Sequence, residues 1–151
     1  MKTKEEIKAK KQRIKEKLAI RALKKREKRE NKISTLENKA DKLWSLVVRK
    51  PWVCAVCWKQ WGKLDPHHIF SRANHSVRWD IENWICLCSW CHTLNSKFSA
   101  HLTPCEFTYW LEKQYSREWV EALGRKARTP KHIDADFLKA TIIYLKSQLW
   151  N

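Results

Sequence analysis

The chain has 151 residues, of which 32 are Lys or Arg and 16 are Asp or Glu, so its formal net charge is +16. The length allows one modest core with extensions, and the positive charge indicates a polyanionic partner, because each neutralised phosphate releases counterions. No apolar stretch approaches the roughly 20 residues of a membrane span, and the Lys-rich N-terminus does not resemble a signal peptide. We therefore expect a cytoplasmic protein without membrane association, whose six cysteines are metal ligands or buried thiols and not disulfides.

Residues 1–50 contain neither Gly nor Pro and are rich in strong helix formers. They predict one long helix that can break near Asn31 and that ends at Pro51. Residues 1–40 carry 16 basic and 6 acidic side chains, a net charge of +10. We expect this helix to bind DNA phosphates without reading sequence, and a solvated helix with no ligand is the alternative. The predicted contacts are Lys10, Lys11, Arg13, Lys17, Arg21, Lys24 and Lys25.

Apolar residues become regular only in the second half of this helix, where they recur at spacings of three and four. This heptad-like stripe predicts a helix face that packs on something. A homodimer formed through residues 33–47 is one predicted assembly. The residues of the stripe are Ile33, Leu36, Ala40, Leu43 and Val47.

Two pairs of cysteines follow, each with two residues between its members: Cys54 and Cys57, then Cys88 and Cys91. Two thiolate pairs can close a tetrahedral Zn²⁺ site, and four Cys ligands leave no open position, so the predicted role of the zinc is structural. The alternative is four buried thiols with chance spacing. The segment between the pairs is longer than in common zinc ribbons, so we expect it to fold. Cys86 and Cys105 receive no role.

Between the cysteine pairs, two strand-like runs at 66–70 and 84–87 precede a helix-like run from 89 to 99. This order predicts a ββα unit, and it contains His67, His68, Asn83 and His92. Taken singly, a His-His pair is commonly surface or core filler, and an Asn such as Asn83 is commonly a turn residue. Their joint spacing, bracketed by the cysteine pairs, favours a chemical role.

On these residues, the segment 52–101 resembles the HNH nuclease family, whose core is a ββα-metal (His-Me finger) fold. The chain is most similar to phage recombination proteins of the NinG (Rap) type, described as branched-DNA or Holliday-junction nucleases. The similarity includes the step Ser71-Arg72, the stretch 75–83, the Lys-rich N-terminus and the pattern of residues 107–123. That branch usually has other residues where this chain has His67 and His92, although both occur in other HNH nucleases. The resemblance therefore supports cleavage more strongly than junction specificity.

With this resemblance, His68 is the expected general base, because an imidazole with a pKa near 6.5 suits proton removal from water. His67 and His92 would hold a divalent cation, with Asn95 as a further contact, direct or through water. Asn83 would bond backbone across the loop and fix the orientation of His68. Mg²⁺ is the expected ion by availability, with Mn²⁺ close behind. Arg72 and Arg78 are candidate phosphate clamps, and solvated charges are the alternative.

Three helices are expected after residue 102. Thr103-Pro104-Cys105-Glu106 matches a capping box, Ser116 can cap a short helix that ends at Gly124, and Asp134 can cap the last helix. The remaining histidines, His75, His101 and His132, are expected to be structural.

The sequence thus predicts a mainly α protein in three parts: a basic helical extension at 1–50, a zinc-bound HNH nuclease core at 51–102 and a C-terminal helical region at 103–151. The predicted function is a metal-dependent DNA endonuclease, structure-specific for branched or Holliday-junction DNA in phage or bacterial recombination. A non-catalytic zinc-finger nucleic-acid-binding protein, an RNA-directed HNH nuclease and an assembly factor are the alternatives.

Overall fold

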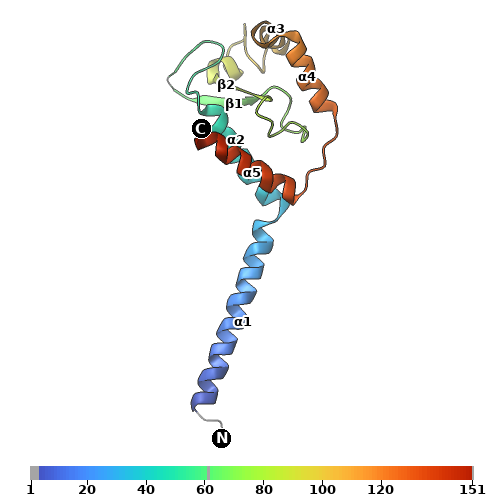
Figure 1. The fold of residues 1–151 in the computed structure, drawn as a ribbon. Helices are drawn as coiled ribbons and strands as arrows, with labels where there is room; N and C mark the ends of the chain where they lie inside the picture. The colour runs from blue at the N-terminus through green and yellow to red at the C-terminus, as the bar shows by residue number, and fades with distance from the viewer. Residues whose placement is uncertain (1–3, 61, 151) are drawn as a thin grey trace.

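The computed structural model describes residues 4–60 and 62–150, with side chains from Lys10 onward. It is mainly helical, with one small sheet (Figure 1). None of the described helices combines the length and the apolar composition that a membrane crossing needs. In chain order the elements are α1 (Lys4–Glu30), α2 (Ile33–Arg49), β1 (Leu64–His68), β2 (Trp84–Cys88), the π-helix η1 (Trp90–Leu94), α3 (Pro104–Tyr115), α4 (Arg117–Arg128) and α5 (Ala135–Trp150).

Residues 4–49 form two helices, because Lys32 between them is extended, with φ −65° and ψ 130°. The predicted break near Asn31 is confirmed. The break falls where the apolar stripe begins. Before it, every described side chain of α1 from Lys10 to Glu30 is exposed. α1 therefore extends away from the body of the molecule, whereas α2 packs against it (Figure 1).

α2 and α5 pack side by side and form much of the core. The predicted stripe is the packed face of α2, with only Ile33 largely exposed. The stripe is therefore not free to pair with a second copy, and a homodimer through residues 33–47 would have to displace α5. The buried residues of α2 are Leu36, Ala40, Trp44, Val47 and Val48, and those of α5 are Leu138, Ile142 and Leu145.

β1 and β2 form a two-stranded antiparallel sheet in which Leu64 pairs with Cys88 and His68 pairs with Trp84. β1 ends at His68, two residues earlier than predicted. The helix expected at 89–99 is a single π-helical turn that ends at Leu94. It stops because Asn95 is extended and its Oδ1 accepts the N–H of Lys97, an Asx turn that competes with the helix.

The C-terminal helices correct two predictions. Thr103 does not cap α3 with its side chain, because its Oγ1 bonds the backbone of Ser99. α4 does not end at Gly124 but continues to Arg128. Gly124 permits a close approach instead, since a Cβ there would lie 3.4 Å from the ring of Phe70. The expected caps at Ser116 and Asp134 are present, through hydrogen bonds from Trp119 N and Phe137 N.

Candidate functional site

The four paired cysteines come together from the turn after α2, the end of β2 and η1. Their Sγ atoms all lie within 4.8 Å of one another, and those of Cys57 and Cys88 are 3.6 Å apart. Zn–S bonds of about 2.3 Å place two ligands of a tetrahedral ion about 3.8 Å apart. The four thiols could therefore hold one metal ion.

The backbone around Cys54 favours a thiolate. Burial is the largest influence on the pKa of Cys54 and raises it, but backbone N–H groups, chiefly those of Cys57 and Cys88, together bring the pKa below its ordinary value. Trp58, with φ 59°, closes the turn by donating its N–H to the carbonyl of Cys54. Cys86 lies outside the group, and burial raises its pKa to about 11, so its thiol stays protonated near neutral pH.

Three histidines form a second cluster. His67 in β1, His92 in η1 and His101 before α3 each bring a ring nitrogen within 4.8 Å of the other two. Nε2 of His92 and Nε2 of His101 are 3.2 Å apart. The predicted pair of His67 and His92 therefore meets, and His101, which the sequence analysis assigned a structural role, joins it.

Burial favours the neutral form of two of these imidazoles, those of His67 and His92. It lowers the pKa of His67 to about 3, with further lowering by the nearby His92, His101 and His68. Burial also lowers the pKa of His92, although the Asp65 carboxylate opposes this. A neutral imidazole has a free lone pair, which a metal ligand needs.

Asp65 supports His92 from behind. Its Oδ2 lies 3.6 Å from Nδ1 of His92 and accepts a hydrogen bond from Oγ of Ser89 at 3.1 Å. A carboxylate on the far nitrogen fixes the ring and leaves Nε2 for a metal. Asp65 is not among the predicted site residues, although it stands two residues before His67 and residues so spaced share one face of a strand.

Asn95 does not join the histidines. Its Oδ1 accepts the N–H of Lys97 at 2.9 Å, and it does not line the cleft that contains the cluster. The Asx turn that ends η1 uses its carbonyl oxygen, and the metal contact of Asn95 stays a prediction.

His68 lies beside the cluster and is held in one orientation. Its Nε2 is 2.9 Å from the carbonyl oxygen of Arg78, and its ring stacks on Trp44 at 3.7 Å with planes 7° apart. A carbonyl oxygen only accepts, so Nε2 carries the proton and Nδ1 is the basic nitrogen. Burial lowers the pKa of His68, partly offset by this hydrogen bond.

Asn83 holds the loop that follows His68, as the sequence analysis expected. Its side chain is fully buried. Oδ1 accepts the N–H of Phe70 at 2.7 Å, and Nδ2 donates to the carbonyls of Phe70 at 2.9 Å and Val77 at 3.0 Å. These bonds tie both ends of the loop to one side chain.

The two candidate phosphate clamps differ. Arg78 is 12% exposed, and its Nε and Nη2 bond both oxygens of Asp41 at 3.0 and 2.6 Å. It is therefore an internal support and not a free phosphate clamp. Arg72 bonds Asp41 through one nitrogen at 3.0 Å but is 66% exposed, and it lines the histidine cleft. The sequence offered no sign that Asp41 would take part.

A cleft with a volume of about 410 Å³ is lined by several of the side chains described above. His67 and His68, adjacent in sequence, both line it, together with His92, His101 and Arg72. It can hold an anionic group beside the basic nitrogen of His68 and three imidazoles that could bind a metal ion. The remaining histidines lie elsewhere: His75 faces Glu37 at 3.6 Å, and His132 is 87% exposed.

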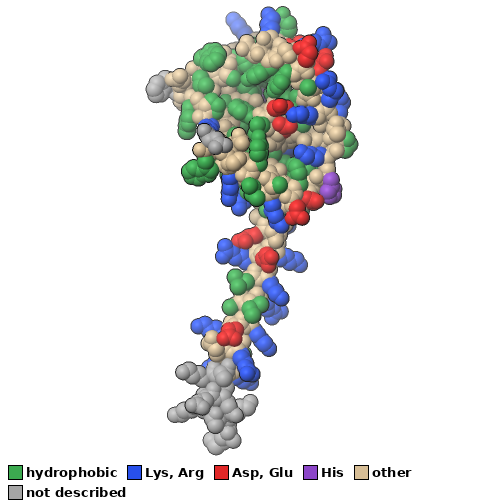
Figure 2. Space-filling model, viewed as in Figure 1, with side chains coloured by type: hydrophobic (Ala, Val, Ile, Leu, Met, Phe, Trp, Pro, Cys, Tyr) green, Lys and Arg blue, Asp and Glu red, His purple; other side chains and the backbone are tan. Residues whose placement is uncertain are grey.

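The seven basic residues predicted to bind DNA are all exposed on α1. Figure 2 shows Lys and Arg side chains projecting along this helix, while apolar side chains gather on the body. Lys10, Lys17 and Lys24 recur every seven residues and so share one face of the helix. α1 can therefore present a row of positive charge beyond the body.

Comparisons of the chain with protein-family models, with curated proteins and with solved structures find no match. These comparisons therefore assign no family to the chain.

Proposed function

We propose that this protein is a metal-dependent endonuclease that hydrolyses phosphodiester bonds in DNA. The observation that carries the proposal is the arrangement of His68. Its Nε2 is fixed by the carbonyl of Arg78, which makes Nδ1 the base, and it lines the same cleft as a cluster of three histidines that could hold a metal. A fixed base beside a metal site, with Arg72 at the edge, is what phosphodiester hydrolysis requires.

The proposed ligands of the catalytic ion are His67, His92 and His101. Metal–nitrogen bonds of about 2.0–2.1 Å place two ligands of a tetrahedral ion about 3.4 Å apart, close to the 3.2 Å between Nε2 of His92 and Nε2 of His101. Three ligands leave a position for substrate. Because all three donors are imidazoles and Mg²⁺ prefers oxygen, Mn²⁺ or another transition ion fits this set better than Mg²⁺.

Each protein group has one task. His68 removes the proton from the attacking water, Arg72 binds the phosphate, and Asn83 holds the loop that contains the Arg78 carbonyl. A bound divalent ion would stabilise the charge that develops on the leaving oxygen. The order of β1, the loop, β2 and η1 agrees with the ββα-metal core that the sequence resembles.

The proposed ion of the four-cysteine group is structural Zn²⁺. Cys54 and Cys57 anchor the turn after α2, and Cys88 and Cys91 join β2 to η1, so one ion would link the two sides of the core. Four protein ligands leave no position for substrate.

DNA is the proposed substrate because the chain carries +16 and α1 displays its charge to solvent. Branched or Holliday-junction DNA, as in phage or bacterial recombination, is proposed from the resemblance of the sequence. An RNA-directed nuclease and a non-catalytic zinc-finger binding protein are outcomes that the experiment separates.

The test incubates the protein with 5′-labelled linear duplex, single strand, flap, four-way junction and RNA, with Mn²⁺, Mg²⁺ or no added ion. We expect metal-dependent cutting of DNA that falls at least about 100-fold in His68→Ala and is unchanged in His132→Ala, a control at a side chain that is 87% exposed. Binding without cutting on any substrate would contradict the proposal and support a binding protein. Cutting confined to RNA would show that the substrate is RNA and not DNA.

A further inference from the structure

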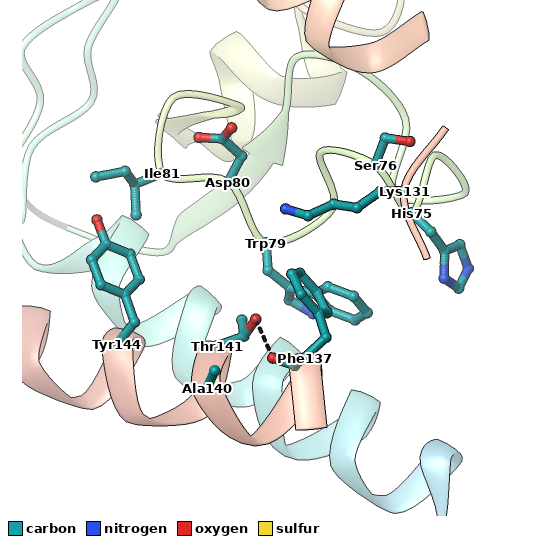
Figure 3. A pocket seen from close by; sticks show the side chains of 10 residues that line it. All are labelled: His75, Ser76, Trp79, Asp80, Ile81, Lys131, Phe137, Ala140, Thr141 and Tyr144. Atoms are coloured by element: carbon teal, nitrogen blue, oxygen red, sulfur yellow. Dashed lines mark hydrogen bonds between the residues drawn. The ribbon is translucent and has the colours of Figure 1, made fainter. Parts of the chain in front are cut away.

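A second cavity, of about 330 Å³, lies apart from the histidine cleft and has no part in the proposed hydrolysis. Three segments distant in sequence enclose it (Figure 3): the loop 75–81 between the strands, the connection 129–134 ahead of α5, and α5 itself. Its volume falls within the range of small-molecule sites.

The walls of this cavity are aromatic. Figure 3 shows Tyr144 facing Phe137 and Trp79 across a space whose floor is formed by Ala140 and Thr141. The four α5 residues recur at spacings of three, one and three, so they share one face of the helix. The rings of Trp79 and Phe137 have centroids 6.4 Å apart. Small residues between aromatic walls leave room for a flat ring.

Cationic groups stand at the edge of the aromatic cavity. Lys131 holds its Nζ 4.4 Å from the centre of the Phe137 ring. A neighbouring cavity shares Ser76, Asp80 and Lys131 with the first and adds Arg125 and Lys126. The Asp80 carboxylate is the one acidic group that lines either cavity in the described part of the chain, and Nζ of Lys126 lies 3.6 Å from it.

We infer that this cavity binds one unpaired nucleotide of a nucleic-acid strand, an inference that rests on the proposed action on nucleic acid. The base lies in the space between Tyr144 and Phe137 and stacks on the ring of Tyr144, which is 43% exposed, as bases stack on aromatic side chains in single-strand-binding proteins. Its phosphates lie toward Lys131 and Arg125. Asp80 and the hydroxyl of Thr141, which donates to the Phe137 carbonyl at 2.9 Å, remain able to accept from an N–H group of the base, such as N3–H of thymine or uracil.

The cavity is connected to the proposed catalytic base. Trp79, which forms one wall, donates its indole N–H to Asp41 at 2.8 Å. Arg78, its neighbour, bonds the same carboxylate, and the carbonyl of Arg78 orients His68. The loop that orients His68, the proposed catalytic base, therefore also holds the nucleotide. Substrates with an unpaired nucleotide near the cut, such as gaps, flaps and junctions, are then favoured over continuous duplex.

The test measures binding without cutting. His68→Ala protein, with no added divalent ion, is titrated into fluorescein-labelled dT₆, U₆ and a fully paired hairpin, and anisotropy is recorded. Thr141→Trp fills the cavity and Tyr144→Ala removes one wall. We expect each to weaken dT₆ or U₆ binding about 5- to 100-fold, the range for loss of one stacked base, with less than about a 2-fold change on the hairpin.

Matched controls lie on the outer face of the same helix. Ile143→Trp adds the same ring at a residue that is 70% exposed, and it should leave all affinities unchanged. Equal effects of Thr141→Trp and Ile143→Trp, or unchanged single-strand affinity in both cavity variants, would overturn the inference. The measurement needs neither metal nor His68. A failure of the nuclease proposal would therefore produce neither of these two contradicting outcomes. If T141W does not fold, the thermal melt will show it, and Tyr144→Ala alone decides.

Discussion

His101 lies beside His92 because their backbones are paired: the N–H of His101 donates to the carbonyl of His92 at 3.2 Å, and their Nε2 atoms are also 3.2 Å apart. The adjacent residue, Ala100, bonds Cys91 in the same way. The segment before α3 is thus attached to η1, which places a third imidazole opposite His67. The four-cysteine group and the three-histidine cluster therefore share η1, which contributes Cys91 to the first and His92 to the second.

We predict that His101→Ala removes one bound transition ion from the protein and leaves the ion at the four cysteines. The remaining two imidazoles no longer provide the three ligands of an open catalytic site. Metal content, measured by plasma mass spectrometry after dialysis against Mn²⁺ or Zn²⁺, should fall from two ions to one. His75→Ala, which alters a histidine outside the cleft, is the control and should keep both ions. Unchanged metal content in His101→Ala would remove His101 from the ligand set.

Asn83→Ala should lower the free energy of unfolding by about 2–5 kcal/mol, because three buried or partly buried backbone groups lose their hydrogen bonds. Urea denaturation followed by tryptophan fluorescence measures the change. Asn95→Ala is the matched control: Asn95 bonds only its own turn, so the variant should lose less than about 1 kcal/mol and retain both ions. A stable Asn83→Ala protein would show that the loop is held by other contacts.

The sequence predicted those features that depend on local spacing. The cysteine pairs meet as their spacing predicts. His67 meets His92 and Asn83 bonds across its loop, as the resemblance of the sequence implies. The break before α2 and the face that α2 buries also follow from the apolar pattern.

Features that depend on tertiary packing could not be predicted in this way. His101 reaches the cluster through backbone pairing, for which the sequence carries no periodic signal. The sequence alone does not distinguish Arg72 from Arg78. The position of Asp41 on α2 makes Arg78 a buried support and leaves Arg72 exposed. The α5 helix covers the stripe of α2, and nothing local to residues 33–47 distinguishes that partner from a second copy.

The two arginines give a further prediction. Arg78→Ala should cost about 2–4 kcal/mol of stability, because Asp41 keeps its partly buried charge and loses its bidentate partner. Arg72→Ala should change stability by less than about 1 kcal/mol, as for other exposed pairs, but should weaken DNA cleavage. Chemical denaturation and cleavage rates on the same preparations separate the two effects. Loss of cleavage without loss of stability in Arg78→Ala would restore Arg78 as a phosphate contact.

Removal of the ion at the four cysteines should unfold the core. Structural zinc sites contribute about 10–16 kcal/mol in small domains, which is as large as the stability of a typical protein. We expect Cys57→Ser to lose the near-ultraviolet circular dichroism of the packed tryptophans. Cys105→Ser, which alters an equally exposed cysteine outside the group, should keep it. An identical spectrum for both variants would show that the core does not need this ion.

The row of lysines on α1 should govern the salt dependence of DNA binding. Replacing Lys10, Lys17 and Lys24 with Gln removes three charges from one exposed helix face, and each lost phosphate contact lowers the slope of log K against log salt by about 0.9 on duplex DNA. We expect the slope to fall by about 2–3 with no change in melting temperature. A variant with Gln at Lys113, Lys139 and Lys146, exposed residues of α3 and α5, loses the same net charge and is the control. If both triple variants change the slope equally, net charge alone attracts DNA and α1 has no special part in binding it.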